Sequence, residues 1–284
     1  LDGASLYELM ESERVTISAG VPTIWMALMQ HMETNKLKLT TMRRTVVGGS
    51  AIPQALIAKF ADEYDVEVRH GWGMTETTAA ATTSMLNASD LGLPAAQQHA
   101  IVAKQGKSLY GIEIKVVDEA GTALPRDGIS QGELYVRGQW VVSGYFKSEQ
   151  SALINGWFPT GDIASIEANG RMQIRDRTKD VIKSGGEWIS SIDLENAALA
   201  HPAVAMAAVI GVKHPKWEER PLLLIVRKPG AAVEREDILA FLDGRVAKWW
   251  IPDEILFVEA LPVGGTGKVQ KNELRKQYGG VFNT

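Results

Sequence analysis

Residues 66–76 read Val66-Glu67-Val68-Arg69-His70-Gly71-Trp72-Gly73-Met74-Thr75-Glu76, a short β-branched run that leads into a glycine-bracketed loop. In an open α/β sheet, ligands bind at the carboxyl ends of the strands, so a loop of this kind is a candidate ligand site. We therefore expect the chain around this stretch to alternate strands with helices.

The preceding sequence shows this alternation. The spacing of apolar and β-branched residues predicts helices over residues 7–11, 22–33 and 53–63 and strands over residues 15–17, 45–47 and 66–68. Pro22 and Pro53 suit the first turn of a helix, where the missing N–H has no partner to lose. Residues 1–100 are thus predicted to form an α/β part with a parallel sheet.

The pattern changes to a period of two between Gly111 and Asp176, which is typical of antiparallel strands. Predicted strands cover residues 112–117, 132–136, 163–166 and 172–174, with turn signals at 119–121 and 169–170. Residues 101–177 are therefore predicted to be mainly antiparallel β structure.

A compact α+β domain is predicted over residues 178–284. It begins with a strand and a helix opened by Ser190, which has Asp193 three residues on. Strands near 205–212 and 222–227 and a helix near 236–242 follow. The charged stretch 175–180 marks the boundary, and by composition alone such a run is more often a solvated loop.

Composition excludes several classes of protein. The net charge of -4 over 284 residues provides no electrostatic footprint for nucleic acid or an anionic membrane. The absence of cysteine excludes disulfides and thiolate metal sites, and the five histidines are scattered. No apolar run approaches the ~20 residues of a membrane span. The first residue is Leu1, without a signal-peptide pattern, which indicates a piece of a longer protein. We expect a cytoplasmic protein and leave open peripheral membrane association and a homodimer.

Two loops follow predicted strands and contain glycine. In Val47–Pro53 two glycines precede a helix start, so the backbone can approach a ligand, although an ordinary tight turn explains this pattern equally well. In His70–Thr77 a hydroxyl and a carboxylate stand side by side, which suits a nucleotide phosphate and its Mg2+ ion. The alternative is that Thr75 caps the next helix and Glu76 is a first-turn acid.

Three later segments carry further candidates. Asp162 ends Trp157–Asp162 just where a strand is predicted to begin, and it could accept hydrogen bonds from both ribose hydroxyls or only from its own turn. Residues 176–190 join a charged segment to a Gly-Gly loop beside a tryptophan. Lys268 lies among glycines in Pro262–Val269, where its ammonium suits contact with phosphate or carboxylate oxygens; taken alone it would be a surface lysine.

In this order, the five segments together resemble the adenylate-forming acyl-CoA synthetase superfamily, which includes firefly luciferase and the adenylation domains of peptide synthetases. The resemblance covers nearly the whole chain. It implies the C-terminal part of a large flavodoxin-like and β-barrel N-terminal domain, followed by a small α+β lid domain with a hinge near Lys179. The family's Ser/Thr/Gly-rich phosphate loop ending in Pro-Lys-Gly has no counterpart here, so it should precede Leu1 and the chain alone should be poorly active.

The resemblance also implies residue roles. Lys268, Thr75 and Glu76 would be catalytic, with Thr75 on the α-phosphate and Glu76 on Mg2+. Asp162 and Arg177 would hold the ribose. The ATP and AMP site would further comprise Gly48, Gly49, Ser50, Ala51, His70, Gly71, Trp72, Gly73, Met74 and Ile174. Coenzyme A would contact Lys183, Gly185, Gly186, Glu187 and Trp188.

The implied reaction is ATP-dependent activation of a carboxylic acid to an acyl-adenylate and transfer of the acyl group to coenzyme A. Medium- or long-chain fatty acids are the leading substrates. Alternatives are methylmercaptopropionate, an aryl acid, or an adenylating domain with another acceptor. A non-catalytic nucleotide-binding module would require loss of Glu76, Asp162 or Lys268, and all three are present.

Overall fold

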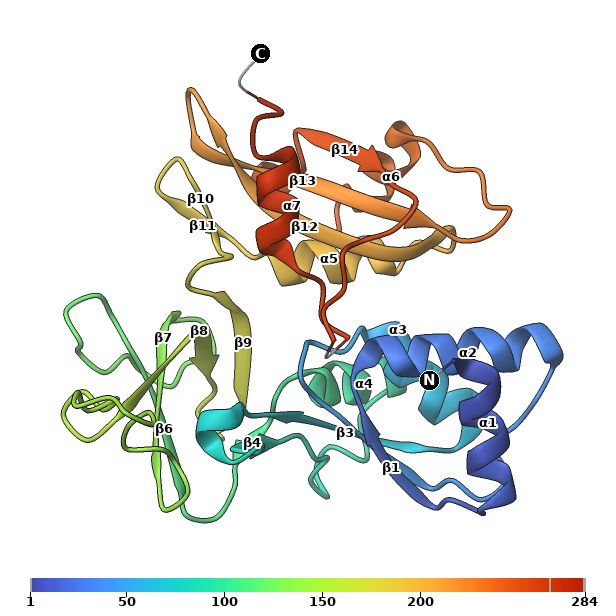
Figure 1. Ribbon diagram of the computed structural model, residues 1–284, viewed down its shortest axis with the longest axis horizontal. Helices are drawn as coiled ribbons and strands as arrows, with labels where there is room; N and C mark the ends of the chain where they lie inside the picture. Colours follow the sequence, from blue (N-terminus) through green and yellow to red (C-terminus); the bar gives the residue numbers. More distant parts are fainter. Residues whose placement is uncertain (1, 266, 283–284) are drawn as a thin grey trace. The chain divides into compact units, whose positions relative to one another are not determined.

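The computed structural model describes residues 2–265 and 267–282. The chain divides into two compact units, one up to Ile174 and the other from Arg175 (Figure 1). The domain boundary predicted after residue 177 stays a prediction.

The first unit contains a sheet with the order β1-β2-β3-β4-β5. Its parallel part comprises β1 (Ile17–Gly20), β2 (Arg44–Val47) and β3 (Glu67–Trp72), and the short strands β4 (Thr82–Thr83) and β5 (Lys107–Ser108) continue it antiparallel. The strand predicted over residues 15–17 begins only at Ile17, because the Val15 N–H bonds the Met10 carbonyl (2.9 Å) in the turn that follows α1.

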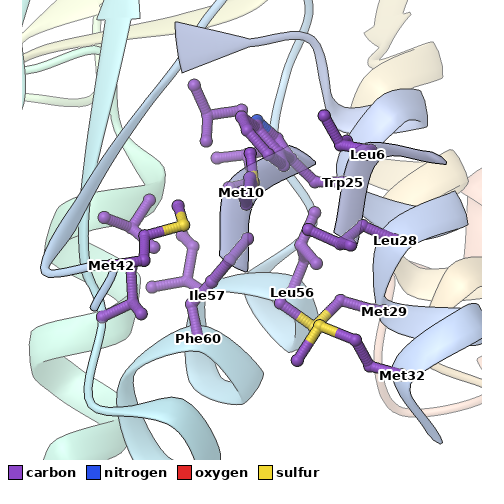
Figure 2. Packing of buried hydrophobic residues seen from close by; sticks show 14 of the residues in the cluster. Leu6, Met10, Trp25, Leu28, Met29, Met32, Met42, Leu56, Ile57 and Phe60 are labelled. Atoms are coloured by element: carbon purple, nitrogen blue, oxygen red, sulfur yellow. The ribbon is translucent and has the colours of Figure 1, made fainter. Parts of the chain in front are cut away.

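Helices cover this parallel sheet. They are α1 (Gly3–Ser12), α2 (Pro22–Asn35), α3 (Gln54–Ala58) with a π-helical turn (Lys59–Glu63), and the unpredicted α4 (Ala95–Ala103). Their apolar faces form a core in which Trp25 meets Phe60 edge to face at 5.9 Å between ring centroids (Figure 2). No helix in the described residues is long and apolar enough to cross a membrane.

The second sheet of this unit has the order β6-β7-β8-β9. It comprises β6 (Ile112–Val117), β7 (Gly132–Gly138), β8 (Phe158–Ile166) and the first residues of β9 (Met172–Arg177), whose residues from Arg175 on belong to the second unit. The pairs β6–β7 and β7–β8 are antiparallel, as the period of two predicts. The prediction that a strand begins only after Asp162 is wrong. A register shift between Glu133 and Tyr135 lets β8 run through this motif as a bulge, with Gly161 at φ +72°.

The second unit is built on the sheet β11-β10-β13-β12, with β14 parallel to β13. Its strands are β10 (Ile182–Ser184), β11 (Glu187–Ile189), β12 (Val204–His214), β13 (Glu218–Arg227) and β14 (Glu254–Phe257). Its helices are α5 (Ser191–Leu199), α6 (Arg235–Leu242) and α7 (Lys271–Tyr278). Ser190 caps α5 by accepting a hydrogen bond from the Asp193 N–H (3.1 Å), as predicted.

Both faces of β12 and β13 are buried. Leu223 and Ile225 pack in one cluster with residues of α5 and α6, whereas Leu222 and Leu224 pack in another with Leu274 of α7. Helices on both faces explain why these strands are continuously apolar instead of alternating.

The charged stretch 175–180 is not a solvated loop throughout. Asp176 and Asp180 are buried, while residues 177–179 between them are exposed. The composition-based expectation is therefore wrong for the two aspartates, because basic side chains from α7 approach them.

Candidate functional site

Two glycine loops meet at the carboxyl ends of β2 and β3. The strands are in register with Val47 opposite His70, so the residues that follow each strand leave the sheet side by side. A Cβ on Gly48 would lie 3.1 Å from the Gly71 carbonyl oxygen. The next residue, Gly49, has φ +82°. The loop after β2 thus lies against Gly71 near the end of β3 through Gly48, and Gly49, Ser50 and Ala51 follow directly.

After β3 the chain turns sharply at Gly73. A Cβ at Gly73 would lie 2.2 Å from the Ala79 carbonyl oxygen, so only glycine fits without displacing the backbone. The turn closes through Thr77, whose hydroxyl accepts from the Met74 N–H (3.0 Å) and donates to the Met74 carbonyl (3.1 Å). Thr77, not Thr75, therefore stabilises this turn, and Thr75 is exposed.

His70 is buried beneath the loop. Its Nδ1 donates to the Ala103 carbonyl oxygen at 2.8 Å, and burial lowers the pKa of the imidazole. The ring therefore serves the packing between β3 and α4 as a neutral group. Its predicted contact with a nucleotide stays a prediction.

The indole of Trp72 reaches Asp162. The Trp72 Nε1–H donates to Asp162 Oδ2 at 2.8 Å, although the two residues are 90 positions apart. Asp162 is only 5% exposed, and its N–H bonds the Thr160 hydroxyl (3.1 Å), which in turn donates to the Leu134 carbonyl (2.8 Å). The bulge in β8 and the end of β3 together fix this carboxylate.

Glu76 also receives a hydrogen bond from an aromatic side chain. The Tyr145 hydroxyl donates to Glu76 Oε1 at 2.9 Å, and this bond raises the pKa of Tyr145. The Glu76 carbonyl accepts from the Val142 N–H (2.9 Å). Sequence reasoning missed Tyr145, because it lies in a segment without a motif and no local signal connects it with Glu76.

The donor set around Glu76 suits a shared magnesium ion. The described residues hold no group of three or more His, Cys, Asp or Glu side chains that could bind a metal alone. Mg2+ is usually held by one or two carboxylates together with phosphate oxygens and water, so a single half-buried Glu76 fits an ion brought with a nucleotide. Elsewhere in the same unit, the Ile174 N–H bonds the Gln105 side chain at 2.6 Å.

In the second unit, the segment predicted to contact coenzyme A is a hairpin. Gly185 and Gly186 form the two-residue turn between β10 and β11 with φ +61° and +87°, both positive as a type I′ turn requires. Lys183 stands opposite Trp188, and Ser184 opposite Glu187. Trp217 covers the turn: its carbonyl accepts from the Gly185 N–H (2.9 Å) and its ring lies against Gly185. Sequence reasoning missed this tryptophan.

The remaining predicted residues of the second unit are exposed cations. Arg177 and Lys179 lie in the exposed part of the 175–180 stretch. Lys268 is exposed on a short hairpin closed by hydrogen bonds from Gly264 N–H to the Lys268 carbonyl and from Gln270 N–H to the Pro262 carbonyl, both 2.8 Å. Thr266, part of the same motif, lies outside the described residues.

The chain matches two protein families. Residues 1–146 match the family described as AMP-binding enzyme, and residues 193–268 match the AMP-binding enzyme C-terminal domain.

Named relatives are acyl-CoA ligases. The chain is 50% identical over 283 residues to 3-methylmercaptopropionyl-CoA ligase of Ruegeria pomeroyi and 46% identical over 283 residues to the medium-chain-fatty-acid--CoA ligase of Ectopseudomonas oleovorans. Each alignment covers 99% of this chain and 52% of the relative, so the chain spans about half the length of these relatives. The crystal structure of ATP-bound MatB from Rhodopseudomonas palustris is similar with a TM-score of 0.83 at 30% identity, covering 99% of this chain and 54% of that one.

Proposed function

The chain belongs to the AMP-binding enzyme family. We propose that it is part of an enzyme that activates a carboxylic acid with ATP and transfers the acyl group to coenzyme A. The observation that carries the proposal is the arrangement after β3, where Thr75 and Glu76 follow the strand and Trp72 bonds Asp162. A hydroxyl, a carboxylate and a second carboxylate near a strand end are the groups that a Mg2+-bound nucleotide requires.

In the first unit, each group has one role in this proposal. Asp162 accepts hydrogen bonds from the ribose hydroxyls, and Arg177 donates to the ribose oxygens. The exposed hydroxyl of Thr75 donates to the α-phosphate. Gly48, Gly49, Ser50, Ala51 and the loop His70–Met74 border the adenine and the acyl group, and Ile174 packs beside the nucleotide. A bound Mg2+ ion, held by Glu76, would neutralise phosphate charge.

The first half-reaction joins two anions. A carboxylate oxygen bonds to the α-phosphorus, while the bond from that phosphorus to the bridging oxygen breaks and its electron pair leaves with pyrophosphate. Negative charge accumulates between the reactants, so the ammonium of Lys268 lowers the barrier by electrostatic stabilisation. The product is an acyl-adenylate.

The second half-reaction uses the β10–β11 hairpin. The sulfur of coenzyme A bonds to the acyl carbon, the bond to AMP breaks, and the thiol proton passes to solvent. Lys183 and Trp188, paired across the hairpin, would contact the thiol substrate together with Gly185, Gly186 and Glu187. The alternation between the half-reactions would require a rotation at Lys179, since a few hinge residues can absorb such a domain motion.

The acid is proposed to carry an apolar chain, with 3-methylmercaptopropionate and medium- or long-chain fatty acids as the leading classes. Support comes from the two relatives at 50% and 46% identity, which are ligases for 3-methylmercaptopropionate and for medium-chain fatty acids. An aryl acid is the alternative.

The test is acid-dependent pyrophosphate exchange by the full-length protein with 3-methylmercaptopropionate, octanoate, palmitate and benzoate. We expect exchange with at least one of the first three acids, and acyl-thioester formation when coenzyme A is added. Glu76→Gln serves as the negative control. Binding of ATP without exchange on any acid, or transfer to hydroxylamine but never to coenzyme A, would overturn the proposal.

A further inference from the structure

Lys268 is placed by the start of α7. The short hairpin that carries it closes between Pro262 and Gln270, and α7 begins at the next residue, Lys271. Lys268 therefore lies only three residues before the first residue of α7. A displacement of the start of α7 would displace the backbone of Lys268 with it.

Lys271 inserts its ammonium into a cluster of acidic groups. Its Nζ lies 2.7 Å from Glu195 Oε1 and donates to Ser191 Oγ at 2.6 Å. Ser191 in turn bonds Asp176, since its hydroxyl and its N–H both donate to the Asp176 carboxylate, at 3.0 and 2.6 Å. A continuous chain of hydrogen bonds thus connects the first residue of α7 with Asp176.

A second contact lies one helical turn later. Arg275 donates to Asp180 Oδ1 at 2.6 Å. Lys271 and Arg275 are four residues apart on α7, and Asp176 and Asp180 are four residues apart on the charged stretch. The two contacts therefore bracket the exposed residues Arg177, Thr178 and Lys179, which include the predicted hinge.

Apolar packing already attaches α7 to the sheet, so the ionic contacts are not required for that attachment. Leu274 of α7 is buried in the apolar cluster on β12 and β13, and Tyr278 packs against the same cluster. The side chains of Lys271 and Glu195 are only 14% and 18% exposed. Burial alone lowers the pKa of Lys271, but Glu195 and Asp176 outweigh it and raise that pKa. Buried ion pairs of this kind add little to stability compared with apolar packing, and they can specify one register between two elements.

We propose that Lys271 and Arg275 are positioning residues that fasten the Lys268 hairpin to the 176–180 stretch. The same stretch that is predicted to rotate then also sets where the catalytic lysine lies. This inference rests on the proposed function, because it assigns Lys268 to the first half-reaction only.

The first experiment separates the half-reactions in the full-length protein. Lys271→Met should slow pyrophosphate exchange about 100-fold, the loss that a displacement of about 1 Å can cause, and change thioester formation from supplied acyl-adenylate by less than about threefold. Lys271→Arg, which keeps the charge, should restore part of the exchange rate. Lys276→Met is the matched control, since Lys276 lies on the same helix, is 71% exposed and bonds only Glu273 in the described contacts.

A second variant covers the case that Lys271→Met does not fold. Ser191→Ala breaks the link between Lys271 and Asp176 without leaving a buried charge unpaired. It should also slow exchange more than thioester formation.

The second readout does not depend on activity. Arg177 and Lys179 are trypsin sites in the exposed part of the fastened stretch. Lys271→Met and Ser191→Ala should speed cleavage there about tenfold, as expected from the loss of one hydrogen bond to a charged group, and Lys276→Met should not. Equal losses in both half-reactions, or unchanged cleavage, would overturn the inference. A wild-type protein without pyrophosphate exchange would instead overturn the proposed function. The comparison of trypsin cleavage rates would still test whether Lys271 fastens the 176–180 stretch.

Discussion

Asp162 and Glu76 each accept a hydrogen bond from an aromatic side chain that is distant in sequence. Trp72 donates to Asp162 and Tyr145 donates to Glu76. A carboxylate has about four acceptor positions, so one such bond fixes its orientation and still allows it to accept others. Both aromatic residues therefore orient an acidic group for the nucleotide that we propose.

Removal of the Trp72 donor should weaken ribose recognition. In Trp72→Phe, kcat/KM for ATP should fall about tenfold, because a hydrogen bond to a charged group contributes about 1.5 kcal/mol. The loss with 2′-deoxyATP should be smaller, since that nucleotide lacks one hydroxyl for Asp162. Steady-state exchange assays with both nucleotides measure the ratio.

Trp140→Phe is the control for this prediction, because the Trp140 Nε1–H donates only to a neutral carbonyl, that of Ala80 (3.2 Å). An equal loss with the two nucleotides would contradict a role for Trp72 through Asp162.

Lys268→Ala should abolish adenylate formation and leave thioester formation largely intact. Its ammonium acts only where charge accumulates at the α-phosphate, which the second half-reaction does not require. Single-turnover assays of the full-length protein, started from ATP in one case and from supplied acyl-adenylate in the other, measure the two effects. Equal loss in both assays would remove Lys268 from its proposed role.

At the scale of elements, the two glycines around the end of β3, Gly71 in the strand and Gly73 in the turn after it, differ in what a side chain would meet. A Cβ would meet the Ala79 carbonyl oxygen at 2.2 Å at Gly73, but only the Thr82 carbonyl oxygen at 3.5 Å, an ordinary contact, at Gly71. Gly73→Ala should therefore destabilise the 284-residue chain by about 1–3 kcal/mol.

The matched variant Gly71→Ala should stay within about 0.5 kcal/mol of the wild type. Urea unfolding midpoints at constant slope compare the two. If both glycines tolerate alanine equally, the sharp turn at Gly73 is not a constraint on this loop.

At the scale of the whole chain, ion pairs within the first unit predict a dependence of stability on pH. Arg171 bonds Asp90, and both side chains are largely buried. The Asn87 N–H and then Arg171 lower the pKa of Asp90. A carboxyl whose folded pKa is lowered stabilises the fold above its unfolded pKa of about 3.9, and this contribution disappears as the pH falls through the folded pKa.

Asp90→Asn should accordingly lower Tm at pH 7, and the gap to the wild type should narrow below about pH 4. Thermal unfolding followed at a series of pH values measures the gap. Asp127→Asn is a useful comparison, because the pKa of Asp127 is also lowered but only by the backbone and side chain of its own exposed turn. A constant gap for Asp90→Asn from pH 7 to pH 3 would contradict the assignment.

Local patterns predicted much of the fold. The period-two pattern predicts a strand over residues 112–117, the bounds that β6 has, and Pro22 opens α2 as predicted. The bounds of two strands differ from the prediction for different reasons. Val15 stays outside β1 because of a local bond to Met10, whereas Asp162 lies inside a strand because pairing with the distant β7 through a bulge lets β8 continue.

The sequence by itself determined the type of each layer and the loops in which candidate groups lie, because hydrophobic period, glycine and proline act over a few residues. Only the tertiary structure decided which of these groups meet. Three pairs show this: Trp72 with Asp162, Tyr145 with Glu76, and Lys271 with Asp176. Their members are 90, 69 and 95 residues apart in the sequence, and none of these pairs has a local signature. The buried aspartates of the 175–180 stretch show the reason most plainly: a charge run is solvated by default, and only packing against a distant helix supplies the cations that allow it to be buried.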